Sequence, residues 1–348
     1  MRVLVAPDKF KGSLTAAQAA AAIARGIKKI LPQVEIDLFP MADGGEGTLD
    51  ALATIMGGKI LSRRVHDPLG KPVMARWGWF GSQKSVAIIE MAEASGLHLV
   101  PARKRNPLLT STFGTGELIC AALKRGCREI VIGIGGSATV DGGVGMAQAL
   151  GVEFFDRQGY KLGRPLGGGD LEKIARIGIS NLPSQIYNLR AMVATDVQNP
   201  LLGSKGAARM FGLQKGATPI MVERLERGLR HYARILSRDV LGSPKYFSDL
   251  VTFPGSGAAG GLGVGLRAFL KANFVSGAEM IMHYGHFDAR LRRADLVITG
   301  EGRLDIQSLH GKTPVTVARR AKKFCLPVLV LAGSVGKESE SVAGGGIS

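Results

Sequence analysis

The chain has 348 residues, a length typical of two ordinary domains or one large one, and long enough to bury a core without disulfides. Its 49 glycines show no Gly-x-y period, which excludes collagen, and its three cysteines lack the spacing of a zinc or disulfide framework, which favours a reducing compartment. A formal net charge of +17 attracts anions without indicating which ones.

The N-terminal segment lacks the apolar core of a signal peptide, because Asp8 and Lys9 follow only a short apolar run. No stretch of about 18 uninterrupted apolar residues predicts a membrane span. We therefore expect a cytoplasmic protein that does not bind a membrane.

The first forty residues predict a βαβ unit, with strands at residues 2–6 and 35–39 around a helix at residues 16–30. Thr15 followed by Gln18 is the signature of a capping box at the start of that helix. Residues 40–47 then form a loop at the carboxyl end of a strand and lead into a helix at 48–55.

The pattern changes at residues 59–90, where short runs rich in Val, Trp and Ile predict antiparallel strands and a second domain or an insertion. Alternating helices and strands resume after this segment, and they predict an α/β fold with a largely parallel sheet. The later strands are predicted at residues 129–134, 191–194, 296–299 and 328–332, and the later helices at 115–124, 144–150, 219–236 and 314–323.

Four glycine-rich loops lie at predicted strand ends or helix starts, namely residues 43–47, 135–143, 254–261 and 300–305. Glycine lets backbone N–H groups approach an anion closely, so such loops suit phosphate, although each alone is also explained as a tight turn. Carboxylates beside a phosphate would be repelled without a cation between them. The acids of these loops therefore indicate Mg²⁺ ligands, or a base that acts on a hydroxyl.

Two other function classes compete with phosphate chemistry. Residues 133–138 match the dinucleotide fingerprint G-x-G-x-x-A, and Asp156 lies where a ribose-binding acid is expected, which favours an NAD(P)-dependent oxidoreductase of a small hydroxy acid. Against it, residues 139–143 continue the loop where the fingerprint requires a helix. The basic charge permits a nucleic-acid-binding protein, but the basic clusters are short and scattered, and only 6% of residues are aromatic, so we expect no nucleic-acid partner.

Seven segments together resemble the bacterial glycerate kinase family of type I, whose members are glycerate 2-kinase-like. They are residues 8–13, 40–48, 134–145 (IGGSATVDGGVG), 195–201, 214–217, 254–263 (PGSGAAGGLG) and 294–305 (ADLVITGEGRLD). Each segment alone is a weak signal, but they follow the family's order and run from the first strand nearly to the last residue. Leu213 stands where the family usually has proline, and the family usually continues beyond Ser348 with a strand and a terminal helix.

The resemblance implies an ATP-dependent kinase of D-glycerate, with 2-phosphoglycerate as the expected product. It also implies two α/β domains with the active site in the cleft between them. One is flavodoxin-like with a mainly parallel sheet, and the second has a mixed sheet and is called endonuclease-like. We place the first at residues 1–66 with 287–348 and the second at residues 67–286.

Such a kinase must bind a carboxylate, activate a hydroxyl, hold Mg²⁺ and neutralise the transferring phosphoryl group. Asp196 follows a predicted strand and is our candidate for the general base, although an Asx-turn explains it equally well. Lys9 and Arg303 are the other candidate catalytic residues. Candidate substrate-binding residues are Asp8, Lys11, Ser13 and Asp43.

The ATP phosphates have two candidate cradles in the sequence. Gly255, Ser256 and Gly257 form the first, and Ser137 with Thr139 forms its rival, while Lys312 is placed to clamp phosphate oxygens alongside Arg303. The candidate Mg²⁺ ligands are Asp43, Asp141, Glu301 and Asp305.

Overall fold

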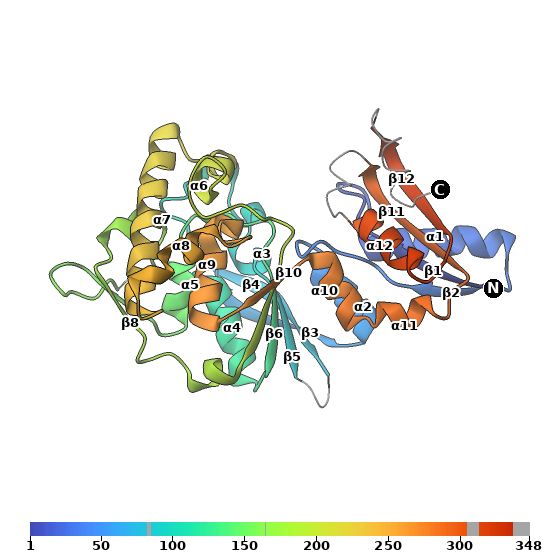
Figure 1. The fold of residues 1–348 in the computed structure, drawn as a ribbon, viewed down its shortest axis with the longest axis horizontal. Coiled ribbons are helices and arrows are strands. Elements are labelled where there is room, and N and C mark those ends of the chain that lie inside the picture. Colours follow the sequence, from blue (N-terminus) through green and yellow to red (C-terminus); the bar gives the residue numbers. More distant parts are fainter. Residues whose placement is uncertain (82–84, 164, 305–312, 337–348) are drawn as a thin grey trace. The chain divides into compact units, whose positions relative to one another are not determined.

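A computed structural model describes residues 1–81, 85–163, 165–304 and 313–336 (Figure 1). The chain divides into two compact units: unit 1 is Met1–Lys59 with Ser276–Ser348, and unit 2 is Ile60–Val275. These bounds lie close to the predicted 1–66 with 287–348 and 67–286. They differ because residues 60–66 form a strand of the unit 2 sheet, and because the helix at 277–284 packs on a helix of unit 1.

Unit 1 contains the predicted βαβ unit, formed by β1 (Arg2–Pro7), α1 (Ala16–Ile30) and β2 (Glu35–Leu38). The capping box is present: the Thr15 hydroxyl accepts from the Gln18 amide, and the Gln18 side chain accepts from the Thr15 amide. Two further strands complete a four-stranded sheet in the order β12-β11-β1-β2, in which every neighbouring pair is parallel. They are β11 (Leu296–Leu304) and β12 (Val328–Val335).

Helices pack around this sheet, and the apolar side chains of β1, α1 and β11 form its core. The helices of unit 1 besides α1 are α2 (Thr48–Met56), α10 (Gly277–Tyr284), α11 (Phe287–Leu291) and α12 (Thr313–Lys322). Helix α12 packs on β11 and begins at Thr313, close to the carboxyl end of β1.

Unit 2 has a six-stranded mixed sheet in the order β10-β9-β6-β5-β4-β3. Strands β5, β6, β9 and β10 are parallel, and β4 is antiparallel to β5, as the sequence of this region predicts. The strands are β3 (Lys59–His66), β4 (Pro72–Phe80), β5 (Val86–Glu90), β6 (Glu129–Gly133), β9 (Arg190–Ala194) and β10 (Asn273–Val275). The carboxyl ends of the four parallel strands therefore share one edge of the sheet.

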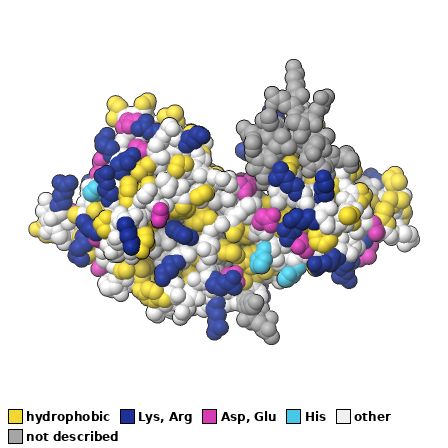
Figure 2. Space-filling model, in the orientation of Figure 1, with side chains coloured by type: hydrophobic (Ala, Val, Ile, Leu, Met, Phe, Trp, Pro, Cys, Tyr) yellow, Lys and Arg dark blue, Asp and Glu magenta, His cyan; other side chains and the backbone are white. Residues whose placement is uncertain are grey.

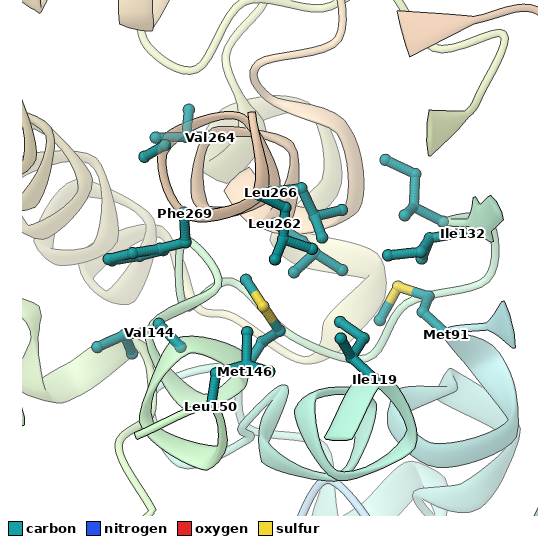
Figure 3. Packing of buried hydrophobic residues seen from close by; sticks show 14 of the residues in the cluster. Met91, Ile119, Ile132, Val144, Met146, Leu150, Leu262, Val264, Leu266 and Phe269 are labelled. Carbon is teal, nitrogen blue, oxygen red and sulfur yellow. The ribbon is translucent and has the colours of Figure 1, made fainter. Parts of the chain in front are cut away.

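Figure 3 shows the core of unit 2, where side chains of two buried helices, α5 (Val144–Ala149) and α9 (Ala258–Leu270), meet residues that follow or form β5 and β6, such as Met91 and Ile132. A separate antiparallel pair, β7 and β8, lies outside the main sheet. The remaining elements of unit 2 are α3 (Ala92–Ser95), α4 (Phe113–Lys124), α5 (Val144–Ala149), β7 (Glu153–Phe155), β8 (Arg176–Gly178), α6 (Ala207–Phe211), α7 (Pro219–Asp239), α8 (Phe247–Thr252) and α9 (Ala258–Leu270).

Basic side chains are dispersed over the surface. In Figure 2, Lys and Arg side chains of each unit lie scattered among polar and apolar ones on the visible face, and they do not form a single continuous patch. In the parts of the chain that the structure describes, no helix combines the length and the apolar character needed to cross a membrane.

Candidate active site

The carboxyl edge of the unit 1 sheet has a topological switch point between β1 and β11. From β1 the chain continues to β2 on one side, and from β11 it continues to β12 on the other, so the two connections leave in opposite directions. Ligands of open parallel sheets bind outside the carboxyl ends of strands at such a point. Asp8 follows β1 directly at this position, and its amide donates to the carbonyl of Gly300 on β11 (2.8 Å).

Asp8 is buried, with 9% of its surface exposed, and both of its carboxylate oxygens accept hydrogen bonds. Oδ2 accepts from the hydroxyl of Thr313 (2.6 Å), and Oδ1 accepts from the amide of Lys9 (2.7 Å). Burial, together with the charge of Asp43, raises the pKa of Asp8 from 3.8 to about 6, although the two hydrogen bonds oppose the rise. Its proton affinity is therefore tuned toward neutral pH, as in a general acid or base.

Lys9 and Asp43 form an ion pair beside Asp8. The Lys9 Nζ lies 3.1 Å from Asp43 Oδ1 and also donates to the carbonyl of Glu46 (3.1 Å). Burial lowers the pKa of Lys9, but the charge of Asp43 and the hydrogen bond to it more than offset this effect, and the net shift is upward. Asp43 Oδ1 also accepts from the Gly45 amide (3.0 Å), whereas Oδ2 accepts no hydrogen bond from the described residues. Asp43 thus presents one carboxylate oxygen that can bind a cation.

Other predicted residues of unit 1 differ in their exposure. Glu301 is buried on β11, which extends through Leu304 and past the end predicted for this strand at residue 299. Arg303 is exposed on the same strand, and Lys11 and Ser13 are exposed after β1. The predicted residues Asp305 and Lys312 lie outside the described residues.

In unit 2, residues 135–139 form a loop directly after β6, which we call the 135–139 loop. Its backbone amides at Gly135, Gly136 and Ser137 have no acceptor among the residues that the structure describes. Gly136 has a left-handed φ of 73° and is exposed, while Ser137 is 8% exposed. Successive unpaired amides around a left-handed residue make a concave anion site, so this loop fits a phosphate group.

Asp141 follows the loop and is fully buried. Oδ2 accepts from the amide and the hydroxyl of Thr112 (2.8 and 2.7 Å) and from the Gly145 amide (3.3 Å), and Oδ1 accepts from the Gly143 amide (3.2 Å). Burial raises the pKa of Asp141, and these hydrogen bonds oppose the rise. Asp141 therefore holds the backbone at the start of α5, and we do not retain it as a Mg²⁺ ligand.

The other predicted cradle, residues 254–261, is occupied by its own backbone contacts; we call it the 254–261 segment. The amides of Ser256, Gly257 and Ala258 donate to carbonyls of Phe253, Asn199 and Gly255, and the buried Ser256 hydroxyl donates to the carbonyl of Val251 (3.1 Å). A Cβ on Gly257 would collide with the Pro200 carbonyl. These glycines serve close packing, so we move the predicted phosphate site to the 135–139 loop.

Two further predictions concern acids of unit 2. Asp196 is exposed after β9, a strand that neighbours β6, so it lies at the same sheet edge as the 135–139 loop. Asp156 is not placed for a ribose, because it follows β7 of the separate two-stranded sheet. Its Oδ1 accepts from the amides of Gln158 and Tyr160 in a turn. Asp156 is therefore not available as the ribose-binding acid that the dinucleotide interpretation requires.

Comparisons with known proteins agree over the whole chain. Residues 3–348 match the family model described as the glycerate kinase family. The chain is 48% identical over 347 residues to the glycerate kinase of Bacillus subtilis strain 168, covering 100% of this chain and 88% of that protein. The chain belongs to the glycerate kinase family.

The other relatives are consistent with this assignment. The glycerate 2-kinase of Escherichia coli strain K12 is 46% identical over 335 residues, which cover 96% of this chain and 86% of that protein. A crystal structure described as glycerate kinase 2 from Salmonella typhimurium LT2 superposes with a TM-score of 0.87 at 44% identity, covering 97% of this chain and 89% of that one. Membership of the glycerate kinase family confirms the predicted kinase class, and the comparisons support neither the oxidoreductase nor the nucleic-acid-binding alternative.

Two residues of this family member were not selected from the sequence. Thr313 was given no role, and its contact with Asp8 joins positions 305 residues apart. Lys215 lies in a segment that carries the family resemblance, yet we assigned it no role, and the structure places it beneath the 135–139 loop. Besides that resemblance, the sequence signal for Lys215 is a lysine flanked by Gly212 and Gly216.

Proposed function

We propose that this protein transfers the γ-phosphoryl group of ATP to D-glycerate and releases 2-phosphoglycerate. The observation that carries the proposal is the identity of 46–48% along the whole chain with proteins named glycerate kinase and glycerate 2-kinase. The region around Asp8 supplies carboxylates and the 135–139 loop supplies amides that have no acceptor in the described parts of the chain, and such a reaction requires both kinds of group.

Asp8 is the proposed general base that accepts the proton of the glycerate hydroxyl. It lies at the switch point of the unit 1 sheet, and with a pKa of about 6 it is a carboxylate at neutral pH while remaining a better base than an exposed aspartate. The hydrogen bond from Thr313 fixes the orientation of its side chain. Asp196, the base predicted from the sequence, is exposed and remains the competing candidate.

Asp43 is the proposed Mg²⁺ ligand, with Glu301 as a second candidate. No group of three or more His, Cys, Asp or Glu side chains in the described ranges is arranged to hold a metal. This fits Mg²⁺ in kinases, which keeps several waters and is held by one or two carboxylates together with substrate phosphates. When bound, Mg²⁺ neutralises charge on the phosphates; Lys9 holds the Asp43 carboxylate in place.

The 135–139 loop is the proposed site for the nucleotide phosphates. The amides of Gly135, Gly136 and Ser137 provide donors that need no side-chain movement to reach an anion. The Ser137 hydroxyl adds a further donor at the same place.

The test compares Asp8→Asn with Asp196→Asn in a coupled ADP-release assay, with the product identified by phosphorus NMR. We expect Asp8→Asn to lower kcat by about 10²- to 10⁴-fold and to abolish the activity rise with pH near 6, because only the carboxylate form accepts the proton. Asp196→Asn is expected to keep both. The reverse result identifies Asp196 as the base, and a wild-type enzyme that forms no 2-phosphoglycerate refutes the proposed function.

A further inference from the structure

Lys215 is a buried cation in the interior of unit 2. Only 2% of its surface is exposed, and its Nζ donates to the Ser137 hydroxyl (2.6 Å) and to the Thr139 carbonyl (2.7 Å). It ends a short 3₁₀ turn, Leu213–Lys215, and the next residue, Gly216, has a left-handed φ of 89° and packs so closely on Arg105 that a Cβ would collide with its carbonyl. The backbone around Lys215 is thus fixed from both sides.

In the described part of the chain, Lys215 has no carboxylate paired with its ammonium group. Among the described residues, its Nζ contacts a hydroxyl and a carbonyl and no carboxylate, and Asp141 acts on it only at longer range. Burial therefore dominates and lowers the pKa of Lys215 from 10.5 to about 7, although the charge of Asp141 opposes the fall. A buried ammonium without a paired anion is costly, and a hydrophobic side chain of similar length would pack there without that cost.

The 135–139 loop, which Lys215 contacts, carries hydrogen-bond donors that an anion would satisfy. Within the described ranges the amides of Gly135, Gly136 and Ser137 have no acceptor, and the Ser137 hydroxyl accepts from Lys215. The buried hydroxyl of Thr139 also has no hydrogen-bond partner among the described residues. An anion on the loop would satisfy the amides and at the same time compensate the buried charge.

We propose that Lys215 is a positioning residue of the nucleotide-phosphate site, which fixes Ser137 and the loop amides and supplies the positive charge that a bound phosphate group neutralises. The inference rests on the proposed function for the identity of the occupant, the phosphate chain of an adenine nucleotide. Because a phosphate anion stabilises the ammonium form, binding near or above pH 7 draws a proton onto Lys215.

The titratable groups that act on Lys215 or on its neighbour Asp141 do not produce the same response. Asp141 is fully enclosed by its hydrogen bonds, and burial raises the pKa of Tyr232 on α7 well above 10, so Tyr232 stays protonated at pH 8. Arg105, on the segment packed against Gly216, is permanently charged and donates to the Val100 carbonyl. At pH 8 the phosphates of ADP have already lost their protons. A proton taken up on ADP binding therefore reports on Lys215.

The test measures binding of MgADP by calorimetry at pH 8 in two buffers of different ionisation enthalpy, for the wild type, Lys215→Met and Lys205→Met. Lys205 is an exposed lysine of the same unit and is the matched control. We expect the wild type and Lys205→Met to take up close to one proton per site, and Lys215→Met to take up none and bind MgADP about 10- to 100-fold more weakly. Thermal unfolding checks that Lys215→Met is folded.

Several outcomes overturn the proposal. One is a folded Lys215→Met that binds MgADP as tightly as the wild type. Others are a wild type without proton uptake, which needs no variant, and uptake on binding D-glycerate alone instead of MgADP. If the wild type takes up the proton with MgADP but forms no phosphoglycerate, the role of Lys215 stands and the proposed function fails.

Discussion

The two glycine-rich regions of unit 2 look alike in sequence, but they differ in whether their backbone amides donate hydrogen bonds to described residues of the protein. In the 135–139 loop three consecutive amides have no described acceptor, whereas in the 254–261 segment the amides of Ser256, Gly257 and Ala258 all donate to carbonyls. The second region also supports the first, since the Gly142 amide donates to the carbonyl of Gly260 (3.1 Å). Glycine content therefore indicates close backbone approach, and only the hydrogen bonds tell whether a ligand or the protein itself approaches.

The strongest test of this difference is Gly260→Ala. Gly260 has a left-handed φ of 69°, and a Cβ would collide with the Thr139 carbonyl, so we expect unfolding free energy to fall by about 4 kcal/mol or more. Urea unfolding of the full chain measures the change, and Gly163→Ala, where a Cβ meets nothing within 4 Å, is the neutral control. A stable Gly260→Ala enzyme with a raised KM for ATP would instead assign the 254–261 segment to the nucleotide.

A second test uses pH, because only the 135–139 loop lies on a buried titratable cation. The pKa of Lys215 is about 7 in the folded state and 10.5 when unfolded, so the unfolded chain binds more protons between these values. The unfolding free energy should therefore rise with pH across this window, by about 1.4 kcal/mol for each pH unit, and the gain is lost as pH falls through 7. Urea titrations from pH 7.5 to 9.5 measure the slope, and a slope equal to that of Lys215→Met contradicts the assignment.

The smallest expected effects come from a matched pair of serines. Ser256→Ala removes a buried hydrogen bond to the Val251 carbonyl and should lower unfolding free energy by about 1 kcal/mol without changing the KM for ATP. Ser137→Ala should raise that KM about 10-fold, since it removes the hydroxyl that Lys215 holds beside the open amides. Steady-state kinetics and thermal unfolding of both variants separate the two roles, and an exchange of the two phenotypes would reverse the comparison.

Local signals predicted most of the fold. The bounds of α1 follow from its capping box, and the antiparallel arrangement of β4 and β5 follows from the changed pattern after residue 59. Helix α9 was not predicted, because its first half lies in the densest glycine region of the sequence, and in the structure left-handed residues from Ala259 to Gly261 form a kink near its start. Contacts with distant segments hold this kink in place, such as the hydrogen bond from the Gly142 amide to the Gly260 carbonyl, and local sequence does not predict them.

The candidate site was predictable only in part, for a related reason. Asp8, Asp43 and Ser137 follow strands, and the rule that sites form at the carboxyl ends of parallel strands selects them from sequence. The hydrogen-bond partners of these residues are distant in the chain. Thr313 contacts Asp8, and Lys215 contacts Ser137 from 78 positions away. The 254–261 segment was assigned to phosphate because the sequence does not reveal which residues pack against it, such as Asn199, whose carbonyl accepts from the Gly257 amide.

The chain order of unit 1 also bears on how the protein is made. Strand β1 pairs with β2 on one side and with β11 on the other, and β11 begins only at Leu296. During synthesis from the N-terminus, all of Ile60–Val275 leaves the ribosome before β11 exists. The middle of the chain can therefore complete its sheet first, while the earliest strand to emerge keeps one edge open until Leu296–Leu304 has been added.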